Sequence, residues 1–163
     1  MSSHAHAPRR SADEQARLHA AITDLWERRI TFNGVLGLRV ESLDPAAPRL
    51  RFDMRPELVG HYLYGRLHGG VISAVLDATG GYALTLGIGE KHPDETAEQV
   101  MHRFGRMGTI DLRIDYLRPA IGERFVLTAQ VLRLGSRVAS TRMEFSGADG
   151  KLLATGAAAY IVS

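Results

Sequence analysis

The chain has 163 residues, of which 45% are hydrophobic and 23% charged, and its formal net charge is +2. This balance is typical of one globular domain that can bury a core, and it excludes a disordered or fibrous chain. The absence of cysteine excludes disulfides, thiol catalysis and thiolate metal sites. Basic residues are scattered and no long apolar run is uninterrupted, so we expect neither a nucleic-acid partner nor a membrane partner.

The N-terminal region is predicted to be a tail followed by a helix. Residues 1–11 are small and polar, and we expect a disordered tail before a single domain over residues 12–163. Apolar residues then recur at three- and four-residue spacing, which predicts a helix from about Ala12 to Thr31. Asn33-Gly34 is predicted to end this helix.

The next segments alternate between strand and loop patterns. Alternation between Val35 and Met54 predicts a hairpin whose turn is the proline-rich segment 44–48. Residues 56–67 are predicted to be a loop. The charged connector 88–107 contains Pro93, which could begin a short helix. The sequence leaves open whether this connector caps a binding pocket or is a surface insertion.

The C-terminal third gives the clearest structural signal. Ile110, Leu112, Ile114 and Tyr116 alternate with polar residues, which predicts a half-buried strand. Three further strands are separated by short turns, of which Asp149-Gly150 is a strong hairpin signal. We therefore predict a meander of four antiparallel strands, at about 110–116, 123–134, 137–147 and 151–162. A long apolar helix must lie across this sheet, so the fold class is α+β.

That apolar helix begins at His68-Gly69-Gly70 and is predicted to fade near Gly87. Its residues are apolar on every face, which indicates a buried helix. It carries Asp77, and a carboxylate in that setting needs a hydrogen-bonding partner or a chemical role. The free N–H groups of the helix start suit an anion or a developing oxyanion. The pattern therefore predicts a carbonyl polarised at the helix start and a carboxylate that acts on it.

Helix geometry separates these two features within one chain. Nine residues at 100° each place His68 and Asp77 about half a turn apart, and roughly 13 Å apart along the axis. A two-fold dimer with antiparallel helices would bring Asp77 of one chain to the helix start of the other. The simpler alternative is that Gly69-Gly70 only permits a tight turn and that Asp77 hydrogen-bonds to loop backbone.

At this point the sequence resembles a known family. The segment 65–70 (Gly-Arg-Leu-His-Gly-Gly), Asp77, the strand 108–120 and the turn 134–139 are similar to those of hotdog-fold acyl-CoA thioesterases of the PaaI-like group. The resemblance covers roughly residues 33–162. It implies a hotdog fold, in which an antiparallel sheet wraps around a central buried helix, here with an extra N-terminal helix.

The resemblance also implies an activity and roles for individual residues. A homodimer, expected to pair into a homotetramer, would hydrolyse acyl-CoA without a metal or other cofactor. Apart from the resemblance, the absence of cysteine and of an apolar stretch in residues 1–12 predicts a cytoplasmic protein. At the helix start, formed by Gly69 and Gly70, the Gly69 N–H would polarise the thioester carbonyl, and His68 would orient the loop. Asp77 of the partner subunit would be the general base or the nucleophile. Thr109 occupies a place where family members often carry a hydroxyl near the attacking water.

Four residues match positions that face coenzyme A in the family: Arg118, Arg133, Ser136 and Arg137. Tyr62 is a fifth candidate for substrate binding, although it departs from the family, because many members have asparagine six residues before the histidine. The sequence leaves open the acyl group, which could be aryl or a short or medium aliphatic chain. It also leaves open two other functions on the same fold, a non-catalytic acyl-CoA-binding protein and an acyl-thioester dehydratase or hydratase.

Overall fold

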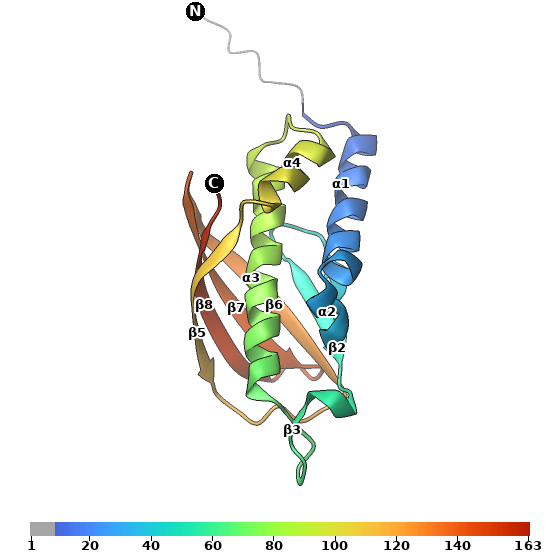
Figure 1. Ribbon diagram of the computed structural model, residues 1–163, viewed down its shortest axis with the longest axis vertical. Coiled ribbons are helices and arrows are strands. Elements are labelled where there is room, and N and C mark those ends of the chain that lie inside the picture. Colours follow the sequence, from blue (N-terminus) through green and yellow to red (C-terminus); the bar gives the residue numbers. More distant parts are fainter. Residues whose placement is uncertain (1–8) are drawn as a thin grey trace, which may run out of the picture.

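A six-stranded antiparallel sheet in the order β1-β2-β6-β7-β8-β5 curves around one long helix, α3 (Gly69–Lys91) (Figure 1). The computed structural model describes residues 9–163. Three shorter helices lie beside α3 on the side away from the sheet. The predicted α+β architecture, with an antiparallel sheet around a central helix and an additional N-terminal helix, is confirmed.

The N-terminal helix is longer and more broken than its sequence predicts. Helix α1 (Ala12–Asp24) continues as a π-helical turn (Leu25–Arg29), and α2 (Thr31–Leu36) follows after a break at Ile30. Asn33-Gly34 lies inside α2, so the prediction that it ends the helix is wrong. The Asn33 side chain is buried and donates to the carbonyl of Trp26 at 3.1 Å, which makes it part of the packing. Gly37 ends α2 instead, with a left-handed φ of 73°.

The predicted tail meets the folded part at Arg10 and Ser11. Residues 1–8 lie outside the described part of the chain. Ser11 caps α1 by accepting a hydrogen bond from the Glu14 N–H. The Arg10 guanidinium donates to the carbonyls of Gly89 and His92 at the end of α3. These two residues, which the sequence assigned to the tail, therefore contact the folded part through hydrogen bonds.

The predicted hairpin is present as β1 (Arg39–Ser42) and β2 (Arg49–Asp53), although residues 35–38 end a helix instead of starting a strand. The loop predicted for 56–67 is wrong in part. It contains a 3-10 turn (Pro56–Leu58) and a small two-stranded sheet of β3 (Val59–His61) and β4 (Arg66–Leu67). Strands this short carry too few residues to show alternation.

Helix α3 runs four residues past Gly87, up to Lys91. The ammonium group of Lys91 donates to the carbonyls of Leu134 and Gly135, which ties this end to the sheet. Residues 79–86 are fully buried, but one side of the first ten residues stays partly exposed. The prediction that α3 is buried on every face is therefore wrong for the N-terminal half of this helix within one chain.

The connector after α3 forms a second short helix, α4 (Ala97–Phe104). It starts at a capping box made by Thr96 and Gln99, three residues later than predicted from Pro93. Its residues Val100 and Phe104 pack into the core beside α1. The connector therefore covers the C-terminal end of α3, away from the start of the helix (Figure 1).

All four predicted C-terminal strands are present: β5 (Gly108–Tyr116), β6 (Arg124–Leu134), β7 (Val138–Gly147) and β8 (Leu152–Ile161). Strands β6, β7 and β8 form a meander, but β5 pairs with β8 at the sheet edge and β6 pairs with β2. The four-strand meander is therefore wrong in its first connection. Leu117 and Arg118 donate to the Leu153 carbonyl, so the chain passes under the end of the sheet on its way to β6.

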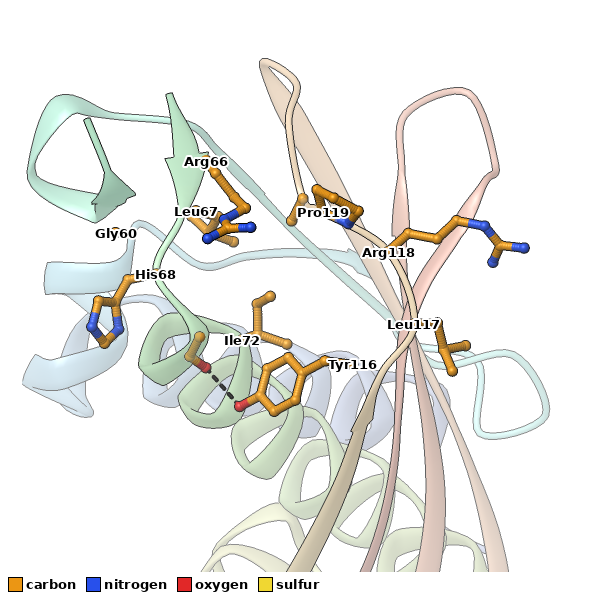
Figure 2. Close-up of a pocket in the computed structure, with 11 residues that line it drawn as sticks. Gly60, Arg66, Leu67, His68, Ile72, Tyr116, Leu117, Arg118 and Pro119 are labelled. Carbon is orange, nitrogen blue, oxygen red and sulfur yellow. Dashed lines mark hydrogen bonds between the residues drawn. The ribbon is translucent and has the colours of Figure 1, made fainter. Parts of the chain in front are cut away.

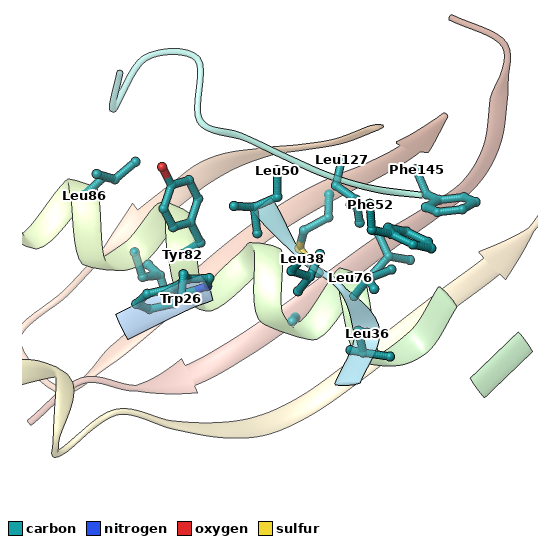
Figure 3. Packing of buried hydrophobic residues seen from close by; sticks show 14 of the residues in the cluster. Trp26, Leu36, Leu38, Leu50, Phe52, Leu76, Tyr82, Leu86, Leu127 and Phe145 are labelled. Carbon is teal, nitrogen blue, oxygen red and sulfur yellow. The ribbon is translucent and has the colours of Figure 1, made fainter. Parts of the chain in front are cut away.

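The core lies between α3, the first helix and the sheet (Figure 3). Trp26 packs against Tyr82 with ring centroids 5.5 Å apart, and it donates to the Ala78 carbonyl at 3.2 Å. Phe125 and Phe145 stack on the inner face of the sheet at 5.1 Å. By length and composition α3 could cross a membrane, yet 61% of its most apolar window is buried inside the fold. This burial is the pattern of a core helix.

Candidate active site

The start of α3 is held by hydrogen bonds of His68. This residue is the N-cap, and its ring Nδ1 accepts from the Gly70 N–H at 2.8 Å. Because Nδ1 is an acceptor, the ring is in the tautomer with its hydrogen on Nε2. The His68 N–H donates to the Leu58 carbonyl at 2.9 Å. A side chain at Gly70 would crowd the ring, since its Cβ would lie 2.9 Å from Nδ1.

Close packing with β3 fixes the same loop from the other side. A Cβ at Gly60 would lie 2.5 Å from the Cα of His68, so the two backbones touch there. Among residues 9–163, the Gly69 N–H makes no hydrogen bond. It lies at the positive end of a 23-residue helix. This N–H is therefore free to donate to a ligand oxygen.

A cavity of about 480 Å³ opens at the helix start (Figure 2). Tyr116 from the end of β5 forms one wall, and its hydroxyl donates to the Gly69 carbonyl at 3.0 Å. The same hydroxyl lies 2.7 Å from Ser73 Oγ. The lining comes from β3, β4, the start of α3 and the segment after β5: Gly60, Arg66, Leu67, His68, Gly69, Ile72, Tyr116, Leu117, Arg118, Pro119 and Ala120.

Asp77 lies farther along α3 and has partners in its own chain. Its Oδ1 accepts a hydrogen bond from Thr109 Oγ1 at 2.9 Å. The hydroxyl of Tyr160 donates to the Asp77 backbone carbonyl at 3.0 Å and lies 3.3 Å from Oδ1. Asp77 is half-buried on the partly open side of the helix. The requirement for a hydrogen-bonding partner is therefore met by side chains of the sheet.

The structure brings the predicted catalytic residues together in two groups. His68, Gly69 and Gly70 form the helix start, and Asp77 with Thr109 forms a second group. Because α3 is continuous between them, Asp77 lies roughly 10 to 13 Å along the axis from the three residues of the helix start. One chain therefore holds the predicted catalytic residues as two separate groups.

The predicted binding residues are distributed over three places. Arg118 lines the cavity, with its guanidinium donating to the Leu152 carbonyl at 2.9 Å. Arg133, Ser136 and Arg137 surround the β6–β7 turn, next to the C-terminal end of α3. Tyr62 lies at the tip of the β3–β4 hairpin, 85% exposed, and does not line the cavity.

Sequence reasoning missed three polar residues near these groups. Ser73 lies one turn into α3, where its hydroxyl donates to the Gly69 carbonyl. The alternation pattern predicts only that Tyr116 lies on the inner face of a strand, not that its hydroxyl contacts Ser73. Tyr160 resembled an ordinary core aromatic in the last strand. A hydroxyl beside a helix start is the only signal that the sequence offered for Ser73. Within the described residues, no group of three or more His, Asp or Glu side chains is arranged to hold a metal ion.

Comparison with known proteins places this geometry in a family. A family model described as thioesterase superfamily matches residues 64–154, more than half of the chain. The chain belongs to the thioesterase superfamily. The match includes the helix start, Asp77 and three of the four C-terminal strands in full. The resemblance to hotdog thioesterases inferred from residues 65–139 is confirmed.

Relatives and solved structures in the superfamily cover nearly the whole chain. A Salmonella typhimurium protein named medium/long-chain acyl-CoA thioesterase YigI is 37% identical over 141 residues, covering 86% of this chain and 91% of that protein. The Escherichia coli protein of the same name is 36% identical over the same length, with the same coverage of both chains. A Shewanella oneidensis crystal structure related to the superfamily superimposes with a TM-score of 0.87 at 35% identity, covering 94% of this chain and 100% of that one.

Proposed function

We propose that this thioesterase-superfamily protein hydrolyses acyl-CoA to the free acid and coenzyme A, with medium- and long-chain acyl groups as substrates. The observation that carries the proposal is the free Gly69 N–H at the start of a 23-residue helix, beside an open cavity of about 480 Å³. The names of the relatives at 36–37% identity support both the reaction and the chain length.

The helix start supplies the electrophilic half of the chemistry. The thioester carbonyl accepts a hydrogen bond from Gly69, and the aligned helix dipole stabilises negative charge that develops on its oxygen. His68 caps the helix through Gly70 and so holds the loop in the shape that leaves Gly69 free. Loss of one such donor costs roughly 10² to 10³ in kcat in other enzymes that stabilise an oxyanion.

The carboxylate half comes from a second copy of the chain. Asp77 of the partner subunit takes a proton from water while the water oxygen bonds to the carbonyl carbon. The carbon–sulfur bond then breaks, and the thiolate receives a proton to leave as coenzyme A. In the nucleophilic alternative, Asp77 forms a mixed anhydride that water hydrolyses in a second step. In a single turnover in ¹⁸O-labelled water, ¹⁸O in the Asp77 carboxylate would identify the nucleophilic route, because the label enters there only when water attacks the aspartyl carbon of the anhydride.

Two exposed features support a two-fold dimer. Strand β5 is a nine-residue edge strand whose N–H and C=O groups face outward along its free side. Beside it, the open side of α3 carries Val71, Ala74 and Ala78, which are small enough to let another helix approach. Pairing two copies along these features makes the helices antiparallel, as the site requires. A homotetramer of two dimers and a cytoplasmic location remain predictions.

Coenzyme A is proposed to bind along cationic side chains outside the cavity. Arg118 lines the cavity of its own subunit. The β6–β7 turn lies at the C-terminal end of α3, and we propose that in an antiparallel dimer Arg133, Ser136 and Arg137 of the partner subunit bind the nucleotide. Replacement of Arg118 by alanine is expected to raise KM and to leave kcat nearly unchanged.

Thiol release from a panel of aryl- and fatty-acyl-CoAs, with wild type and Asp77→Ala compared, tests the proposal. Release by wild type alone, fastest with medium and long chains, is the expected result. Binding of acyl-CoA without release from any substrate would contradict hydrolysis and favour a binding protein. Addition or loss of water at the acyl chain would instead identify a hydratase or dehydratase.

A further inference from the structure

Tyr160, on β8, contacts Asp77 although the proposed mechanism gives it no role. Its side chain is buried, with 2% of its surface exposed, and its hydroxyl reaches both the backbone carbonyl and Oδ1 of Asp77. Thr109 donates to the same oxygen, Oδ1. Within residues 9–163, Oδ2 accepts no hydrogen bond. Thr109 donates to this oxygen, and Tyr160 shares its single hydroxyl hydrogen between the same oxygen and the backbone carbonyl, so the other carboxylate oxygen stays available to a reacting molecule.

The sheet register brings these two donors to the same place. Thr109 on β5 is paired with Tyr160 on β8, so their side chains lie on the same face. The register shifts between Thr109 and Asp111, which is the position of a β-bulge. Because of this shift Thr109 shares the inner face with Leu112, whereas Ile110 is 56% exposed. A bulge that re-aims a side chain in this way is common beside active sites.

The helix has a matching feature opposite Tyr160. Gly80 lies three residues after Asp77, and a Cβ at that position would overlap the Tyr160 hydroxyl. It would also lie 3.0 Å from Thr141 Oγ1. Glycine in a helix interior costs about 1 kcal/mol relative to alanine. Its presence here has a physical reason, since only glycine lets the hydroxyl reach the helix backbone.

The phenol is suited to act as a permanent donor. Burial is the main cause that raises the pKa of Tyr160 far above its usual value, and the charge of Asp77 raises it further. The hydroxyl therefore keeps its proton at neutral pH. In its contact with the carboxylate, the hydrogen comes from Tyr160.

We propose that Tyr160 is a positioning residue for thioester hydrolysis, because its hydroxyl fixes the carboxylate of Asp77 with Oδ2 free to act. This inference rests on the proposed function of Asp77. Tyr160 has no contact with the cavity at the helix start. It acts only through the carboxylate, so it should affect the chemical step and not substrate binding.

Tyr160→Phe tests the proposal against Tyr82→Phe as a matched control. Tyr82 is also fully buried, and its hydroxyl donates to the Ser42 carbonyl at 2.6 Å, away from Asp77. Both variants lose one buried hydroxyl with its hydrogen-bond contacts and should lower the thermal midpoint to a similar extent. Tyr160→Phe is expected to lower kcat about tenfold with KM unchanged, the effect of one hydrogen bond to a charged group. Tyr82→Phe is expected to keep the wild-type kcat per folded molecule.

The outcomes separate this inference from the proposed function. Wild-type kcat in Tyr160→Phe, with Asp77→Ala inactive, would overturn the positioning role and leave the proposed function standing. An active Asp77→Ala would overturn the proposed function itself. Equal losses of kcat in the two phenylalanine variants would show a general effect of stability and would also overturn the positioning role.

Gly80→Ala gives a second, independent measurement. The added methyl group displaces the Tyr160 hydroxyl, so kcat is expected to fall in this variant as it does in Tyr160→Phe. In the Tyr160→Phe background that hydroxyl is absent, and the same substitution should lower kcat little further. If kcat of the double variant fell by the product of the two single-variant factors, the two substitutions would act independently, which would contradict a shared action through the hydroxyl.

Discussion

The contact between Gly60 and His68 offers a test of how strictly the helix start must be placed. In Gly60→Ala the new methyl carbon would lie 2.5 Å from His68 Cα and 2.9 Å from its Cβ. An ordinary carbon–carbon contact is about 3.5 to 4 Å, so β3 and the loop must separate by roughly 1 Å. A misplacement of that size costs on the order of 10²-fold in rate in other enzymes. Overpacking of this kind also destabilises by about 1 to 3 kcal/mol.

We therefore expect Gly60→Ala to lower kcat about a hundredfold, with a smaller loss of thermal stability. The assay is thiol release at saturating acyl-CoA, with the folded fraction measured by circular dichroism. Gly34→Ala is the control, because a Cβ at Gly34 meets nothing within 4 Å and its activity should be that of wild type. A Gly60→Ala enzyme with wild-type kcat and reduced stability would refute the idea that His68 and Gly69 must be held in place for the chemistry.

Three further predictions follow from the site and its surroundings. Asp77→Ala should reduce kcat at least 10³-fold while the protein stays folded and dimeric, as measured by thiol release and light scattering; full activity would exclude the mechanism. Mixing the inactive variants Asp77→Ala and Gly69→Pro, which lacks the N–H donor, should restore part of the activity, because one of the two sites in a heterodimer is then intact; verified heterodimers without activity would argue for a site within one chain. Hydrogen bonding from Arg103 is the main cause that lowers the pKa of Glu95 from 4.5, so Glu95→Gln should cost about 0.5 to 1 kcal/mol of unfolding free energy at pH 7. Because the pKa of Glu95 is lower in the folded than in the unfolded protein, the stability difference between wild type and Glu95→Gln should disappear as the pH falls through and below 4.5. Urea denaturation that gave the same difference at pH 7 and at pH 3 would contradict this prediction.

The sequence predicts those features of the fold that depend on local pattern. Alternation located the C-terminal strands, and the apolar run after Gly70 located α3. Which strands are neighbours depends on contacts far apart in the sequence, so the place of β5 at the edge could not be read from periodicity. The end of α3 was also missed, because its last glycines pack against the sheet and other helices instead of ending it. A Cβ at Gly89, for example, would lie 3.3 Å from Leu18.

Prediction of the site has the same limit. The helix start could be inferred because a glycine pair after a capping histidine is a local pattern with a physical meaning. The role of Ile110 was predicted wrongly, since a bulge at a β-branched residue leaves no mark in the hydrophobic pattern. The bulge is what turns Thr109 toward Asp77. Tyr160 could not be selected at all, because its partner lies 83 residues away in the sequence.

The division of α3 into two halves links the fold to the chemistry. Its second half is enclosed by the sheet and by Trp26, which gives the helix a rigid anchor in its own chain. Its first half carries Gly69 and Asp77 roughly 12 Å apart along the helix axis, so no single copy can direct both at one carbonyl. The open side between them consists of small apolar residues, whose exposure costs free energy in a monomer. Association of two copies would bury that side and complete both sites in the same step, and under the proposed mechanism assembly of the dimer would then be a condition for catalysis.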